Sequence, residues 1–109
     1  MHEKLDCYRQ SVGIAGELGK EMAGWPRGFG FLADQVRRAM ASVVLNMAEG
    51  NGRSGSRERR RFFQIARASV AEVAACVDLM RAYLVISETR ANELKSGLDR
   101  ISRMLFRLH

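Results

Sequence analysis

The sequence predicts an all-α fold, an up-down antiparallel four-helix bundle formed by a single domain over residues 1–109. Apolar residues recur three and four positions apart along four segments, which is the spacing of a helix that buries one face. The only proline is Pro26, and long periodic segments with a single proline favour helices over many short strands. Short polar or glycine-rich connections between these segments make successive helices antiparallel neighbours.

The first two helices are expected at about residues 4–22 and 29–49, separated by a turn around Pro26 and its flanking glycines. The seam of the first helix is predicted to contain Leu5, Tyr8, Val12, Ala15, Gly19 and Met22. The apolar face of the second is predicted to contain Phe29, Leu32, Val36, Ala39 or Met40, Val43 and Met47.

The last two helices are expected at about residues 57–85 and 88–108. Gly50-Asn51-Gly52 should end the second helix, Ser54 or Ser56 should cap the third, and Ser87 should cap the fourth. The seam of the third helix is predicted to contain Phe62, Ile65, Ser69, Val73, Cys76, Met80 and Tyr83. That of the fourth is predicted to contain Ala91, Leu94, Leu98, Ile101, Leu105 and Leu108.

A polar stripe follows one side of the second helix. Arg38, Ser42, Asn46, Glu49 and Arg53 succeed one another at intervals of four, four, three and four, so they should share a face. Two interpretations remain open. The stripe is either a solvated face with weak ion pairs, such as Glu49 with Arg53, or a hydrogen-bonded network buried between helices or subunits.

Positive charge is concentrated in one short segment. The chain carries a net charge of +6, and residues 53–67 contain six arginines against one acid, Glu58. A local basic patch indicates a polyanionic partner more strongly than a uniformly basic surface does. We call these six residues the arginine patch: Arg53, Arg57, Arg59, Arg60, Arg61 and Arg67.

The arginine patch lies at the expected start of the third helix, where positive charge opposes the helix dipole and an anion is favoured. Phosphate would compensate this charge, so the hypothesis is nucleic-acid binding through backbone contacts, RNA or DNA, without strong sequence specificity. The alternative from another class is a structural or adaptor protein whose arginines meet acids of a neighbouring subunit or of an acidic protein partner. A solvated charge run is the third possibility.

The sequence contains no pattern typical of a catalytic or metal-binding bundle. Its two histidines, His2 and His109, lie at the ends of the chain, and the Glu-x-x-His pair of a di-iron bundle does not occur. Glu49 and Glu72 could face each other across the second and third helices, but the nearby arginines favour ion pairs over acid–base chemistry. We therefore expect no enzyme activity, no catalytic residue, no metal and no cofactor.

The remaining sequence features bear on the cellular location of the protein. No stretch of about 18 consecutive apolar residues could form a membrane span, and no apolar signal segment follows Met1. The expected location is the cytoplasm. Cys7 and Cys76 are then expected to be two reduced, buried thiols and not a disulfide.

Two segments carry a family resemblance. QVRRAMASVVLNMAEGNGR at residues 35–53 resembles the signature of the 23S ribosomal RNA intervening-sequence protein family. RFFQIARASVAE at residues 61–72 is similar to the third helix of that family, so the resemblance covers about residues 5–108. The chain is also distantly similar to accessory proteins of diversity-generating retroelements, which assist a reverse transcriptase.

The resemblance implies a left-handed up-down bundle, assembly into a homopentameric ring and a role with nucleic acid. The residues assigned from the polar stripe and the third helix to a structural polar network or a subunit interface are Arg38, Ser42, Asn46, Glu49 and Glu72. The family usually has an aromatic residue where this chain has Arg59, so the start of the third helix is more basic here.

Overall fold

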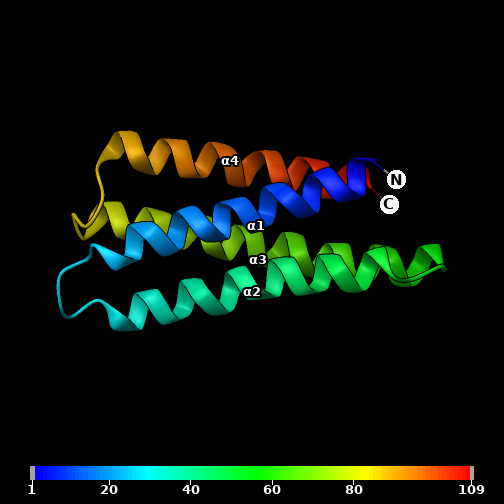
Figure 1. The fold of residues 1–109 in the computed structure, drawn as a ribbon, viewed down its shortest axis with the longest axis horizontal. Coiled ribbons are helices and arrows are strands. Elements are labelled where there is room, and N and C mark those ends of the chain that lie inside the picture. The colour runs from blue at the N-terminus through cyan, green and yellow to red at the C-terminus, as the bar shows by residue number, and fades with distance from the viewer. Residues whose placement is uncertain (1, 109) are drawn as a thin grey trace.

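Four amphipathic helices pack into an up-down bundle in the computed structural model, which describes residues 2–108. They are α1 (His2–Ala23), α2 (Gly30–Asn51), α3 (Ser56–Ala82) and α4 (Glu88–Arg107). Each helix runs antiparallel to the one before it (Figure 1). Met1 and His109 lie outside the described residues. The predicted all-α four-helix bundle is confirmed.

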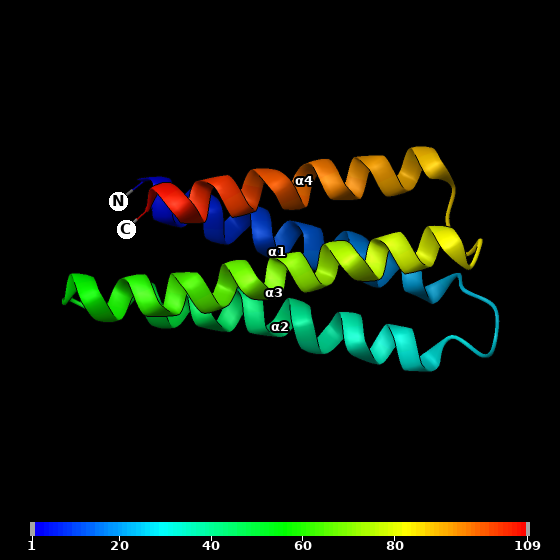
Figure 2. The same ribbon diagram turned by 180° about the vertical axis from the view of Figure 1, so that it is seen from behind.

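Each helix packs against its neighbours in sequence, and α1 also packs against α4, which closes the bundle. The contact between α2 and α3 is the most extensive, followed by that between α3 and α4. Both ends of the chain lie at one end of the bundle, and the connection between α2 and α3 extends past them (Figures 1 and 2). We call this extension, residues 49–61, the tip.

The apolar faces of α2 and α4 are the ones that periodicity predicts. In α4 the predicted residues from Ala91 to Leu105 are buried, and Leu108 is partly buried. Ser87 caps α4 as predicted, because its side chain accepts a hydrogen bond from the Arg90 amide at 3.1 Å.

The predicted seam of the first helix is only partly right. Tyr8, Ala15 and Met22 pack partly buried against the core, whereas Leu5, Val12 and Gly19 are exposed. The buried residues of α1 are Cys7, Ser11, Ile14 and Leu18.

Two stripes of α1 satisfy the three-four spacing. In the second half of the helix the core takes Ile14 and Leu18 over Ala15 and Gly19, because larger apolar side chains gain more from burial. In the first half it takes Cys7 and Ser11, and Leu5 and Val12 are exposed. Ser11 is accommodated because its hydroxyl donates to the Cys7 carbonyl oxygen at 2.9 Å.

The predicted seam of the third helix is correct in its centre and wrong at its ends. Ser69, Val73, Cys76 and Met80 are buried, whereas Ile65 and Tyr83 are exposed and Phe62 is only partly buried. Because α3 packs against both α2 and α4, its buried face is wider than one seam. The additional buried residues of α3 are Phe63, Ala66, Val70 and Val77.

The ends of α3 also differ from the prediction. The residue before the helix is Gly55, and neither Ser54 nor Ser56 caps it, because no side chain makes a cap hydrogen bond and Ser56 is already helical. The helix stops at Ala82 and not at Val85. Leu84 adopts φ 64°, a left-handed conformation that ends the helix, with a side chain that is 88% exposed.

The predicted break at Gly50-Asn51-Gly52 begins too early, because α2 continues through Asn51. Gly50 is a buried helical residue whose position serves close packing. A Cβ atom there would lie 2.6 Å from Cε1 of Phe63 and 3.3 Å from the Cβ of Phe62. Phe63 is fully buried, so its ring has little freedom to move aside.

We predict that Gly50→Ala destabilises the protein by about 1–3 kcal/mol through overpacking against Phe63. The matched control is Gly16→Ala in α1, where a new Cβ meets nothing within 4 Å. That substitution should stabilise the protein by up to about 1 kcal/mol, because alanine favours the helix. Chemical denaturation of both variants measures the difference, and equal effects would contradict the packing role of Gly50.

Both cysteines are free and buried, as the sequence predicts. Burial raises the pKa of the Cys7 thiol to about 11, and the nearby carboxylate of Asp6 adds to the shift. Burial also raises the pKa of Cys76, with a contribution from Glu72. The thiol and not the thiolate is therefore the form that the folded protein stabilises.

We predict that Cys7 resists alkylation by iodoacetamide at pH 8 in the folded protein and reacts once the chain is unfolded. A raised folded-state pKa stabilises the protein below the unfolded value of about 8.5–9, and this contribution is lost as the pH approaches 11. Unfolding free energies measured between pH 8 and 11 should fall less steeply for Cys7→Ala than for the wild type. If the unfolding free energies of the two proteins fall equally steeply with pH, the raised pKa of Cys7 is refuted.

Candidate nucleic-acid interface

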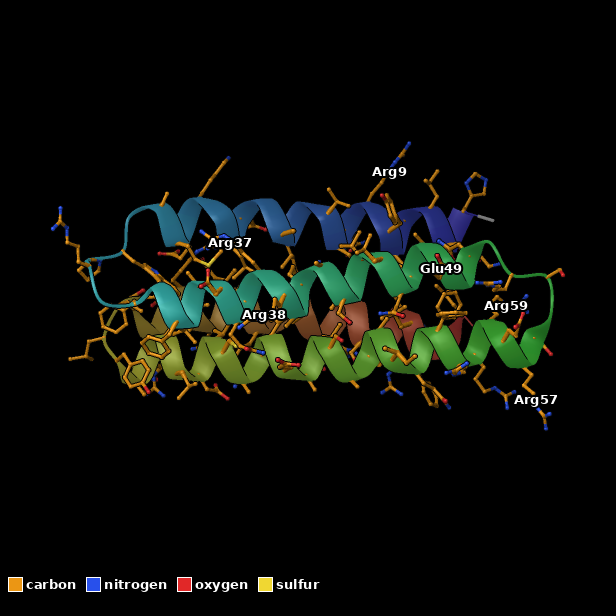
Figure 3. The ribbon with its side chains drawn as sticks, turned by 90° about the horizontal axis from the view of Figure 1, so that it is seen from below. Arg9, Arg37, Arg38, Glu49, Arg57 and Arg59 are labelled. Carbon is orange, nitrogen blue, oxygen red and sulfur yellow. The ribbon has the colours of Figure 1, made fainter. Side chains whose placement is uncertain are left out.

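The exposed arginines of the tip lie at the start of α3. Arg57, Arg60 and Arg61 are exposed, and none of them forms an ion pair or hydrogen bond with any other described side chain. Arg57 points away from the bundle, in the half that also contains Glu49 (Figure 3). The predicted cluster therefore contains three uncompensated guanidinium groups within about one and a half helical turns.

Elsewhere on the bundle many basic side chains meet acids. Arg90 of α4 contacts Glu21 at 3.1 Å and Glu17 at 3.2 Å, both in α1, and these hydrogen bonds raise its pKa. Lys95 lies 2.7 Å from Asp78 across α4 and α3. Other basic side chains, such as Arg9, Arg27 and Arg38, also lack a carboxylate partner among the described residues. The tip is therefore distinguished by the clustering of three such residues, Arg57, Arg60 and Arg61, within five positions.

The whole net charge resides at the tip end. Residues 2–9, 49–67 and 99–108 lie there and contain eleven Lys and Arg residues against five Asp and Glu residues. The rest of the chain holds seven of each sign and is neutral overall. The excess of six positive charges therefore lies at one end of an elongated molecule, and the positive electrostatic potential is strongest there.

Arg53 and Arg59 of the arginine patch differ from the three exposed tip residues. Arg53 is paired with Glu49 at 2.8 Å, as predicted, and its guanidinium lies 5.1 Å from the ring centre of Phe62. Arg59 is only partly exposed, and its Nε is buried without a hydrogen-bond partner among the described residues. Position 59 continues the inner face of α3 beyond the core, at Phe63, Ala66 and Val70, which explains its burial.

Arg67 occupies a separate place on the side of α3 that faces α4. Its Nε donates to the Ser102 hydroxyl at 3.4 Å, and its guanidinium lies 4.8 Å from the ring centre of Phe106. A surface depression there is lined by Arg67, Arg103, Phe106 and Arg107. Arg103, Phe106 and Arg107 are not among the residues predicted from the sequence, although Phe106 stands outside the α4 seam between two arginines.

The polar stripe of α2 divides into a partly buried centre and exposed ends. Ser42 and Ser69 approach to 2.7 Å between their hydroxyl oxygens, and Asn46 donates to the Ser42 carbonyl oxygen at 2.9 Å. Arg38 is exposed and donates to Gln35 at 3.3 Å. Within one chain Ser42 and Asn46 therefore belong to a hydrogen-bonded network, whereas Arg38 and Glu49 are exposed.

The two carboxylates considered as an acid–base pair have different partners. Glu49 contacts Arg53, whereas Glu72 accepts a hydrogen bond from the Gln35 amide. Their expected juxtaposition across α2 and α3 is therefore wrong, because antiparallel packing puts Glu72 opposite the first half of α2. Over residues 2–108 no three His, Cys, Asp or Glu side chains gather closely enough to hold a metal ion. None of the described helices combines the length and apolar character of a membrane span.

Comparison with known proteins gives the family. The model of the family described as 23S rRNA-intervening sequence protein matches residues 3–107. A crystal structure of a protein of unknown function from the S23 ribosomal protein family of Bacteroides thetaiotaomicron has the same fold, with a TM-score of 0.81 and 14% identity over 95% of each chain. No curated protein matches the sequence. Because the family match spans nearly the whole chain, this protein belongs to the 23S rRNA-intervening sequence protein family.

Proposed function

We propose that this protein binds RNA or DNA through the exposed arginines of the tip, as an oligomeric accessory factor without enzymatic activity. The observation that supports this most is the absence of carboxylate partners at Arg57, Arg60 and Arg61. Guanidinium groups bind phosphate through several hydrogen bonds at once, so a phosphate backbone is a suitable counter-charge.

The N-terminus of α3 also favours a bound phosphate. The first amides of α3 have no partner within the helix, and no side chain caps them. These amides and the helix dipole favour an anion, whereas clustered arginines at the same place are unfavourable by about 0.3–1 kcal/mol each without one. Backbone phosphates would satisfy both groups. No base-reading motif accompanies them, so binding should tolerate sequence and depend on salt.

Self-association is the second part of the proposal. The outer side of the α2–α3 pair exposes Leu45 on α2 and Ile65 and Leu79 on α3. Arg38 and Glu72 give the same side charges of both signs, so copies of it could complement each other. The family resemblance implies five copies. A ring would repeat the tip arginines, and weak phosphate contacts would then add up through avidity.

We predict that Arg57, Arg60 and Arg61 together changed to Gln lower affinity for single-stranded RNA and DNA by about tenfold or more at physiological salt. The slope of log affinity against log salt should become shallower by about 2, since three phosphate contacts at about 0.7 each are lost. Fluorescence anisotropy over a salt series measures both quantities. Arg59 stays unchanged because its Nε is buried.

The control variant changes Lys20, Arg27 and Arg37 to Gln, which removes the same charge from exposed positions in residues 20–37, at the end of the bundle away from the tip. It should retain most of the wild-type affinity. Equal losses in the two variants would mean that net charge and not the tip carries binding. Binding of neither RNA nor DNA by the wild type, with an acidic protein recovered instead, would favour the adaptor alternative.

We predict that Leu45→Lys combined with Leu79→Lys converts the oligomer into monomers while helicity is retained. Like charges would replace apolar contacts on the outer side of the α2–α3 pair, and neither side chain contributes to the buried core. Light scattering after size-exclusion chromatography gives the mass, and circular dichroism gives the helicity. A wild-type protein that is itself monomeric would remove the oligomer from the proposal.

A further inference from the structure

The contacts between α3 and α4 change in character along the bundle. Away from the tip they are ion pairs, Arg81 with Glu88 at 3.3 Å and Lys95 with Asp78 at 2.7 Å. Nearer the tip Arg67 faces no acid on α4. It contacts a hydroxyl and an aromatic ring, those of Ser102 and Phe106. The positive charge of Arg67 is therefore positioned by neutral groups.

Phe106 is 59% exposed although it lies beside a well-packed helix pair. Three arginines line the same depression as its ring, namely Arg67, Arg103 and Arg107. Arg103 is paired with Asp99 at 2.8 Å, whereas Arg107 forms no ion pair with the described side chains. An exposed aromatic ring framed by guanidinium groups combines the two features of a single-strand binding surface, a stacking platform and positive charge.

We propose that Phe106, together with Arg67, Arg103 and Arg107, binds an unpaired base of single-stranded nucleic acid, with the base stacked on the exposed part of the ring that Arg67 does not cover and the flanking phosphates held by the arginines. This inference rests on the proposed nucleic-acid function and adds to it a preference for single strands. The tip arginines alone would accept single and double strands alike, because both present phosphate.

The preference for single strands follows from which surfaces of the bases are exposed in a duplex and in a single strand. In a duplex the base faces are already stacked on one another, and a side chain reaches only base edges and the backbone. A single strand exposes base faces, and stacking on an aromatic ring is tolerant of sequence because every base has such a face. Phe106 would therefore distinguish single strands from duplexes without distinguishing one base from another.

The Phe106 site is continuous with the tip. Arg60 and Arg67 lie seven residues apart on the same side of α3, which is about two helical turns or about 10 Å. A strand whose phosphates contact Arg60 would thus need to extend only a short way along α3 to reach Arg67 and Phe106. One strand could occupy both places.

The test compares Phe106→Leu with the wild type on three probes of equal length: single-stranded oligothymidylate, a DNA duplex and an abasic strand. We expect the variant to lose about tenfold in affinity for oligothymidylate and to bind the duplex and the abasic strand as the wild type does. Phe106→Trp should restore or increase affinity for oligothymidylate, because it keeps an aromatic face. Light scattering and thermal melting of each variant confirm the assembly and the fold.

Phe31→Leu is the matched control, because Phe31 is 60% exposed and lies at the opposite end of the bundle. It should leave affinity for all three probes unchanged. If Phe106→Leu binds oligothymidylate like the wild type, or weakens all probes alike, or acts no more strongly than Phe31→Leu, the stacking site is overturned while the tip proposal stands. If the wild type binds none of the probes, the proposed function fails as well.

Discussion

The close approach of α2 and α3 is the contact on which the tip depends. Phe63 is fully buried, and its ring packs against the backbone of Gly50, where any Cβ would collide with it. This contact joins the end of α2 to the first part of α3, and the connection between these two helices extends past both ends of the chain (Figure 1). Because neither α1 nor α4 reaches the end of the extension, the side chains of Arg57, Arg60 and Arg61 are left exposed to water. The exposed arginines follow from this geometry as well as from composition.

The free-energy cost of clustering Arg57, Arg60 and Arg61 at the start of α3 indicates that the single chain lacks the negative charge that would balance them. Surface ion pairs such as Lys95 with Asp78 stabilise proteins only slightly, so their absence at the tip is by itself a small loss. The larger cost comes from like charges that repel each other at a helix start whose dipole already favours anions. Arg59 adds to it, because a buried Nε without a partner loses about 1–3 kcal/mol of hydrogen bonding to water. A polyanion at the tip would offset the repulsion between the exposed arginines and the unfavourable dipole term, but not the cost at the buried Nε of Arg59.

Periodicity predicts the fold and the faces of α2 and α4, because each of these helices has one stripe of large apolar residues. It is only partly right for α1, where two stripes share the three-four spacing and side-chain size accounts for the burial of Ile14 and Leu18 but not for that of Cys7 and Ser11. It also places the end of α2 too early, since Gly50 looks like a helix breaker in sequence and acts as a packing site in three dimensions. The charge cluster of the site is visible in the sequence. Its division into exposed, inward and α4-facing arginines is not, because it depends on which side of α3 each position faces.

Phosphate contacts and base contacts have different structural requirements, and the basic end of the bundle meets them in different places. Phosphates need exposed, mobile guanidinium groups, as at Arg57 and Arg60, and such groups supply affinity without selecting a strand type. Base stacking needs a fixed aromatic face, and α4 provides one at Phe106, adjacent to an arginine that Ser102 holds in place. A surface built from these two parts would bind strongly to any unpaired strand and distinguish it from a duplex. Sequence tolerance together with strand selectivity is therefore the combination that this geometry favours.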